Sequence, residues 1–268
     1  MADPRAFEDV ELQGMLAWHA AASRHDTREF DWSIRRLAGA YCSVSASEPS
    51  ILVNRVMGLG LDSMPSADDL AAIRQLYADA GVGRFFLHVV PELLGEDRES
   101  LLTDAGFVKY RGWMKFGRGR GENGPIGSDL SIRRIDATHA EDFAAIAGDA
   151  FGIGESFRPA TAALVDASGW RVYMSFDGDR PAGTGALFRH GSAASVDFGA
   201  THPDFRRRGS QGALLNTHIR DALADGCTTI VTMTGEAVPG DAQQSYRNIL
   251  KAGFDELYLR ENWIPAGT

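Results

Sequence analysis

The sequence predicts an α/β protein with a mixed sheet that is built in two tandem halves. Short apolar segments alternate with amphipathic ones along the whole chain, which is the pattern of strands and helices. A glycine-rich stretch at residues 119–128 divides the 268 residues into parts of similar size. The two parts also repeat one another at a nearly constant offset. We therefore predict one domain at residues 1–118, a linker at 119–128 and a second domain at 129–268.

The repeat contains a helix end, a strand, a second helix and a last strand in each half. Gly81 corresponds to Gly226 at an offset of 145, and Gly106 corresponds to Gly253 at an offset of 147. Glycine is common just after the last turn of a helix, because it adopts the left-handed conformation without strain. The four glycines therefore predict four helix ends.

The first half begins with a predicted amphipathic helix at residues 11–23, where apolar residues recur at helical spacing. The apolar run 51–56 predicts a strand, and a further helix is expected to begin near Ser66. The turn between them, 58–65, contains glycines together with an aspartate and a proline. Those two residues do not favour a backbone cradle for an anion.

The second half alternates strands and helices throughout. A turn at 177–180 joins two strands into a hairpin. In order, the predicted elements are strand 130–135, a helix with an apolar stripe at 143–150, helix 157–167, hairpin strands 170–176 and 182–190, strand 194–201, a helix that ends at 221–226, strand 228–234, helix 241–252 and a last strand to 263.

The run from Phe205 to Leu215 follows strand 194–201 and opens an amphipathic helix. The first N–H groups of a helix lack partners, and the helix dipole adds positive charge there. Three arginines stand just before a glycine in this run, and they would add charge-assisted contacts. A solvated basic turn is the alternative interpretation. The strands and helices downstream favour an anion-binding site.

This run resembles the acyl-CoA-binding signature of the GNAT N-acetyltransferase superfamily, Arg/Gln-x-x-Gly-x-Gly/Ala. Arg206 and Gly209 take the first and fourth places, whereas Gln211 stands in the sixth and Gly212 follows it. The resemblance implies an enzyme that transfers acetyl from acetyl-CoA to an amine by direct attack in a ternary complex. It also implies two tandem GNAT-like domains, of which the first lacks the signature and is a degenerate copy.

The resemblance further implies how the cofactor lies. The diphosphate would bind to the backbone of the run, and the pantetheine arm would follow strand 194–201, from which strand 228–234 splays apart. The thioester carbonyl would lie near a free N–H of that strand, which stabilises the oxyanion. The implied cofactor-binding residues are Gly199, Ala200, Thr201, Arg206, Arg207, Arg208, Gly209, Ser210, Gln211, Gly212 and Asn248.

Two residues are candidates for proton transfer. Asp197 is the only carboxylate on strand 194–201, and alternation places it on the same face as Gly199 unless a bulge intervenes. It is the candidate general base, acting through water; a structural aspartate is the alternative, and Glu236 is a second candidate. Many GNAT enzymes have a tyrosine as general acid where this chain has Ile249. Tyr246, three residues earlier on the same helix face, is the candidate acid, or else a packing tyrosine.

Composition limits the other classes of function. The net charge of −9 argues against a nucleic-acid binder. Cys42 and Cys227 are far apart and the histidines are scattered, so we expect no disulfide and no metal, in a reduced cytoplasmic setting. No apolar run approaches the ~20 residues that span a bilayer. The acceptor is expected to be a small-molecule or peptide amine, and the oligomeric state stays open.

Two other functions are compatible with these residues. The missing tyrosine leaves room for a non-catalytic regulatory module that binds acyl-CoA. The first half would alternatively recruit a protein partner.

Overall fold

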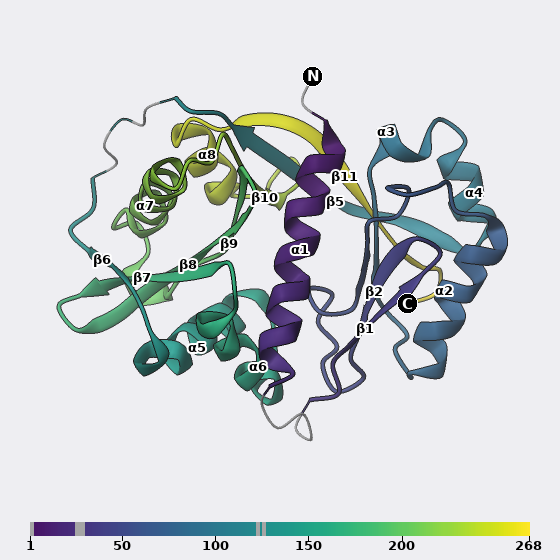
Figure 1. Ribbon diagram of the computed structural model, residues 1–268, viewed down its shortest axis with the longest axis horizontal. Helices are drawn as coiled ribbons and strands as arrows, with labels where there is room; N and C mark the ends of the chain where they lie inside the picture. Colours follow the sequence, from purple (N-terminus) through teal and green to yellow (C-terminus); the bar gives the residue numbers. More distant parts are fainter. Residues whose placement is uncertain (1–2, 25–29, 122–123, 125–126) are drawn as a thin grey trace.

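The computed structural model describes residues 3–24, 30–121, 124 and 127–268. The eleven strands of this part form one mixed sheet in the order β1-β2-β3-β4-β11-β5-β10-β9-β8-β7-β6, which confirms the predicted class (Figure 1). The strands are β1 Ser33–Leu37, β2 Ala40–Val44, β3 Arg55–Met57, β4 Phe86–Val89, β5 Phe107–Arg118, β6 Ser131–Arg134, β7 Trp170–Asp177, β8 Arg180–His190, β9 Ala193–Thr201, β10 Thr229–Gly235 and β11 Asp255–Pro265. The α-helices are α1 Pro4–Ala22, α2 Ala67–Asp79, α3 Pro91–Leu94, α4 Arg98–Asp104, α5 Ala140–Phe151, α6 Arg158–Ala162, α7 Ser210–Ala224 and α8 Gln244–Lys251.

The last strand of each half lies inside the sheet of the other half. Strand β5 pairs antiparallel with β10, strand β11 pairs antiparallel with β4, and β5 and β11 pair with each other at the centre. The two halves therefore share a continuous sheet. The division at 1–118 and 129–268 stays a prediction, and residues 122–123 and 125–126 of the expected linker lie outside the described residues.

The sequence repeat corresponds to a structural repeat. Gly81, Gly106, Gly226 and Gly253 follow α2, α4, α7 and α8, with φ of 73°, 80°, 84° and 76°. Only glycine adopts this left-handed conformation without strain. Each half also contains one parallel strand pair, β3 with β4 and β9 with β10. The repeat is therefore helix, strand, helix and strand in both halves.

The predicted strand 51–56 is wrong in its first part, because β3 begins only at Arg55 and a turn precedes it. The cause is the buried side chain of Asn54. Its Nδ2 donates to the carbonyl oxygens of Ser45 (3.0 Å) and Glu48 (2.6 Å), and its Oδ1 accepts from the Ser45 N–H (2.8 Å). These bonds replace the ladder that a strand would supply.

Helix α1 crosses the middle of the molecule and packs against the second half as well as the first (Figure 1). The indole N–H of Trp18 donates to the carbonyl of Ala160 (2.7 Å), and that of Trp170 donates to the carbonyl of Gly14 (3.0 Å). Buried indoles require such partners. The N-terminal helix is thereby joined to the core of the C-terminal half.

Candidate active site

A cavity of about 230 Å³ lies where β9 and β10 separate. The two strands pair in parallel only from Ala193–Thr229 to Ser195–Val231. The hydroxyl of Thr232 then donates to the carbonyl of Val196 (2.9 Å). Beyond this point the strands have no ladder pairs among the described residues, and the predicted gap between them is present.

A bulge in β9 shapes the wall of this cavity. The register shifts between Thr184 and Ala186 of β8, where β9 carries one extra residue. Phe198 has a φ of 55°, and its carbonyl accepts a hydrogen bond from the Thr184 hydroxyl (2.8 Å). Bulges of this kind re-aim side chains. Asp197 and Gly199 both border the cavity in spite of the bulge between them.

The N-terminus of α7 reaches the same cavity. Gly209 precedes the helix with a φ of 80° and makes no side-chain cap. The first N–H groups of α7 therefore have neither an intrahelical partner nor a capping side chain. A Cβ at Gly209 would overlap the carbonyl oxygen of Gly127. The turn tolerates only glycine here.

The corresponding helix of the first half, α2, has its N-terminus closed. The Ser66 hydroxyl accepts from the Asp69 N–H (3.2 Å), and the Asp69 carboxylate accepts from the Ser66 N–H (2.9 Å). This capping box satisfies two donors and places negative charge where an anion would bind. The first half lacks the phosphate motif in its sequence, and the capping box closes the helix N-terminus at the corresponding position of its structure.

The three arginines before α7 differ in their surroundings. Arg206 and Arg207 are exposed. Arg208 instead forks onto the carboxylate of Asp177 (3.0 and 3.1 Å) and also contacts Asp129. These hydrogen bonds raise the pKa of the Arg208 guanidinium further above its usual value. Arg208 therefore holds the turn against Asp177 of β7 and against Asp129. These carboxylates already accept hydrogen bonds from its guanidinium.

Among the other predicted cofactor residues, Gly199 and Gln211 line the cavity. The Ser210 hydroxyl faces inward and shares a hydrogen bond with that of Ser175 (2.7 Å), so that only its N–H faces outward. Gln211 borders the cavity and accepts from Nδ2 of Asn248 (2.8 Å), which links α7 to α8. Three more predicted residues lie in the nearby backbone without bordering the cavity: Ala200, Thr201 and Gly212.

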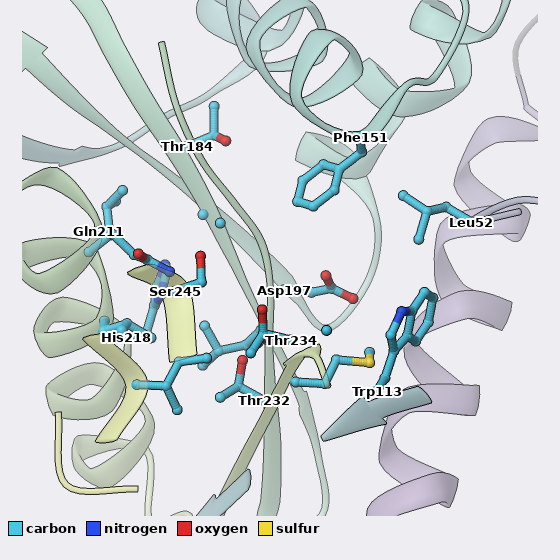
Figure 2. A pocket seen from close by; sticks show the side chains of 18 of the residues that line it. Leu52, Trp113, Phe151, Thr184, Asp197, Gln211, His218, Thr232, Thr234 and Ser245 are labelled. Atoms are coloured by element: carbon cyan, nitrogen blue, oxygen red, sulfur yellow. Dashed lines mark hydrogen bonds between the residues drawn. The ribbon is translucent and has the colours of Figure 1, made fainter. Parts of the chain in front are cut away.

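Asp197 lies deep in the cavity, near the separation of the strands (Figure 2). Its Oδ1 accepts from the Phe198 N–H (2.7 Å). Burial, followed by the negative charge of Glu11, raises the pKa of Asp197, while Arg55 and Lys115 act in the opposite direction. A carboxylate with a raised pKa on a cavity wall has the properties of a general base.

The side chains of Tyr246 and Glu236 make hydrogen bonds outside the cavity. The Tyr246 hydroxyl donates to the Glu256 carboxylate (2.6 Å), and burial together with Glu256 raises its pKa to about 12. Tyr246 does not border the cavity, although Ser245 and Ile249 of the same helix do. Glu236 accepts from the backbone N–H of β5 at residue 112 (3.0 Å). The geometry therefore does not support Tyr246 as the general acid.

The first half contributes three residues to the cavity that sequence reasoning missed: Leu52, Arg55 and Trp113. The turn before β3 carries Leu52, β3 carries Arg55, and β5 carries Trp113. A charged residue inside the apolar run 51–56 was the available signal, because a buried charge needs a partner. Figure 2 shows Leu52 and Trp113 on the Asp197 side of the cavity.

His218 of α7 was also missed. It is buried at the cavity wall, and neither ring nitrogen has a hydrogen-bond partner among the described residues. Burial lowers its pKa to about 4, so the ring is neutral at pH 7. Figure 2 shows His218, Gln211 and Ser245 together at the opposite side from Leu52 and Trp113.

A buried ion network adjoins the Asp197 end. Arg260 donates to Glu8 (3.1 Å) and Glu11 (2.9 Å) of α1, and Lys115 contacts Glu11. Burial alone would raise the pKa of Glu11, but Arg260, Lys115 and Arg55 together lower it to about 2. The network joins α1, β3, β5 and β11, and therefore both halves of the chain.

Metal and membrane sites are not seen in the described part of the chain. No group of three or more His, Cys, Asp or Glu side chains there could hold a metal ion. No helix within these residues is long and apolar enough to cross a bilayer.

Comparisons with known proteins agree with this geometry. Residues 122–242 match the family model of an acetyltransferase (GNAT) domain. No curated protein matches the chain in sequence. Among solved structures, a GCN5-related N-acetyltransferase from Kribbella flavida has a TM-score of 0.67 at 14% identity, with 100% of this chain and 97% of that chain covered. A GCN5-related N-acetyltransferase from Sphaerobacter thermophilus has a TM-score of 0.62 at 13% identity, with coverage of 84% and 76%.

The tandem arrangement is found in a solved structure as well. A tandem GNAT protein from the clavulanic acid biosynthesis pathway has a TM-score of 0.63 at 12% identity, with 92% of this chain and 86% of that chain covered. Identities this low show the fold alone. Residues 122–242 thus match the GNAT acetyltransferase family model, and the chain as a whole has the tandem GNAT fold.

Proposed function

We propose that the protein is an N-acetyltransferase that transfers acetyl from acetyl-CoA to a primary amine by direct attack in a ternary complex. One observation carries the proposal. A single cavity connects the uncapped N-terminus of α7 to the carboxylate of Asp197 through the gap between β9 and β10. In this proposal the anion site and the candidate base lie at two ends of one channel.

In this proposal the diphosphate of CoA binds to the first N–H groups of α7. Arg206 and Arg207 add charge-assisted contacts from the exposed side. The pantetheine arm passes Gly199, where a Cβ would meet open space, and enters the gap between the strands. The thioester then lies near the bulge in β9, where a backbone N–H would stabilise its developing oxyanion.

The chemical step uses Asp197 as a general base. Asp197 takes a proton from the ammonium group through water, and the freed nitrogen attacks the thioester carbonyl carbon. The C–N bond forms and the C–S bond breaks as the CoA thiolate leaves. The nitrogen then gives up its second proton, which reaches the thiolate through water. Because a base must be ionised, turnover falls as the pH drops through the raised pKa of Asp197.

Calorimetry with acetyl-CoA and a free-thiol assay with a panel of amines test the proposal. We expect binding, and thiol release that depends on the amine. If the protein does not bind acetyl-CoA at millimolar concentration, the proposal is refuted.

The second candidate is a non-catalytic module that senses acyl-CoA. It is favoured by Tyr246, whose hydroxyl is held by Glu256 away from the cavity. Binding of acetyl-CoA without thiol release from any amine would support this candidate over the enzyme.

A further inference from the structure

We propose that the acceptor is a small molecule that carries a carboxylate beside its amine, as a free amino acid does. Arg55 binds the carboxylate, and Asp197 receives the proton of the amine. The inference rests on the proposed acetyltransferase function, and it assigns the first half of the chain a part in substrate binding.

Arg55 is the least well paired cation of the buried network. Its Nη1 lies 4.0 Å from the Glu11 carboxylate, and its Nε has no hydrogen-bond partner among the described residues. Lys115 and Arg260, by contrast, make direct hydrogen bonds to Glu11. A buried guanidinium with unused donors is costly, and its planar fork matches a carboxylate. The Arg55 side chain borders the cavity, although its Nε is itself covered, so a ligand would approach the guanidinium from the cavity side.

The charges around this end of the cavity favour a zwitterion over a simple amine. Three cations, Arg55, Lys115 and Arg260, face two carboxylates of α1, Glu8 and Glu11. Ionised Asp197 is the third negative charge, so the set is neutral. An amino acid is also neutral overall, whereas an amine without a carboxylate adds a positive charge to this group.

Two further titratable neighbours, Tyr258 and His88, do not change this count. The Tyr258 hydroxyl donates to Glu8 (2.8 Å), and burial followed by the charge of Glu8 raises its pKa, so it stays neutral. His88 is buried beside the network, and burial followed by the charges of Arg260, Arg55 and Lys115 lowers its pKa well below the usual value. It is therefore neutral.

The positions of Arg55 and Asp197 suit contacts with the two ends of one small molecule. Arg55 and Asp197 both border the cavity, yet no ion pair within 4.0 Å joins them in the described structure. A carboxylate on Arg55 leaves the neighbouring ammonium group within the same part of the cavity as Asp197. The surrounding wall consists of Leu52, Phe151 and Trp113, which suits an apolar side chain (Figure 2).

The test compares matched acceptors in the thiol-release assay. Free amino acids with apolar side chains, such as leucine, are compared with their amides and with the amines that lack the carboxyl group, such as leucinamide and 3-methylbutylamine. We expect kcat/KM for at least one free amino acid to exceed that of its amide and its amine by at least about tenfold, as for loss of one charge-assisted contact. This comparison requires no variant.

The variant Arg55→Met then identifies the residue responsible. We expect it to lower kcat/KM for the amino acid toward that of the amide. At a pH high enough to keep Asp197 ionised, turnover of the amide and binding of acetyl-CoA should change little, because Arg55 otherwise lowers the pKa of Asp197. The amide serves as a control for folding within the same protein. The second variant is Arg55→Lys, which keeps the positive charge without the planar fork of the guanidinium. Its kcat/KM for the amino acid should lie between that of the wild type and that of Arg55→Met.

The outcomes separate the two proposals. Equal turnover of amino acid, amide and amine would overturn the acceptor class and leave the acetyltransferase function standing. An unchanged preference in both Arg55 variants would overturn the role of Arg55. Failure to bind acetyl-CoA would instead refute the proposed function itself.

Discussion

Replacement of Gly209 by alanine tests the anion site with the least change in chemistry. Gly209 has a φ of 80° at the start of α7, and an added Cβ would overlap the carbonyl oxygen of Gly127. The left-handed conformation costs a residue with a Cβ roughly 1–2 kcal/mol. The overlap adds to this cost, because either the turn or the segment at 127–128 has to move.

The expected loss of affinity follows from the contacts that such a movement breaks. A hydrogen bond to a charged group contributes about 1.5–3 kcal/mol. Loss of one N–H contact to the diphosphate would therefore weaken acetyl-CoA binding about 10- to 100-fold. Gly209→Ala should lower the affinity by at least this factor, together with a loss of stability of roughly 1–2 kcal/mol from the strain.

Gly226→Ala is the matched control. Gly226 follows the other end of α7 with a φ of 84°, and a Cβ there would meet nothing within 4 Å. The control has the same strain without the overlap. Calorimetry should give wild-type affinity for Gly226→Ala, while urea denaturation gives a loss of stability from strain in both variants that is larger in Gly209→Ala because of the overlap. Wild-type affinity in Gly209→Ala would refute the placement of the diphosphate.

Three further predictions concern proton transfer and stability. Asp197→Asn should lower kcat/KM by about 10²–10⁴-fold and abolish the acidic limb of the pH–rate profile, with acetyl-CoA affinity unchanged in calorimetry. Tyr246→Phe should keep its turnover but lose about 1 kcal/mol of stability to urea, because the Glu256 carboxylate loses a hydrogen bond; a collapse of kcat would show that this tyrosine is catalytic after all. His218 has a folded pKa of about 4, below its usual value, so the unfolded chain takes up a proton before the folded protein does as the pH falls. The free energy of unfolding should drop by roughly 2 kcal/mol from this group between pH 7 and pH 5, and the drop should be smaller in His218→Asn; equal drops would contradict the role of burial.

Local patterns in the sequence were sufficient for the features that depend on neighbouring residues. The four glycines after helices, the turn that leads into α7 and the uncapped start of that helix are set by backbone preferences over a few residues. The same holds for the capping box at Ser66, which closes the corresponding helix of the first half. The mixed α/β class and the tandem arrangement follow from the order of such elements, and both were confirmed.

Other features depend on partners that are distant in sequence, and only the tertiary structure decided them. Asn54 delays the start of the predicted strand because its amide bonds to a neighbouring loop, and this turn precedes Arg55 at the cavity. Tyr246 and Arg208 were candidates for the site, but Glu256 and Asp177 hold them in structural roles.

The exchange of β5 and β11 between the halves is the largest such effect. It brings Trp113 and Lys115 of β5 beside Arg260 of β11. Carboxylates of α1 then form ion pairs with Lys115 and Arg260. The sequence alone determined where the proposed anion site lies, because a helix start is a local structure. The Asp197 end of the cavity is assembled from both halves across a shared sheet, and no local pattern encodes which distant side chains meet there.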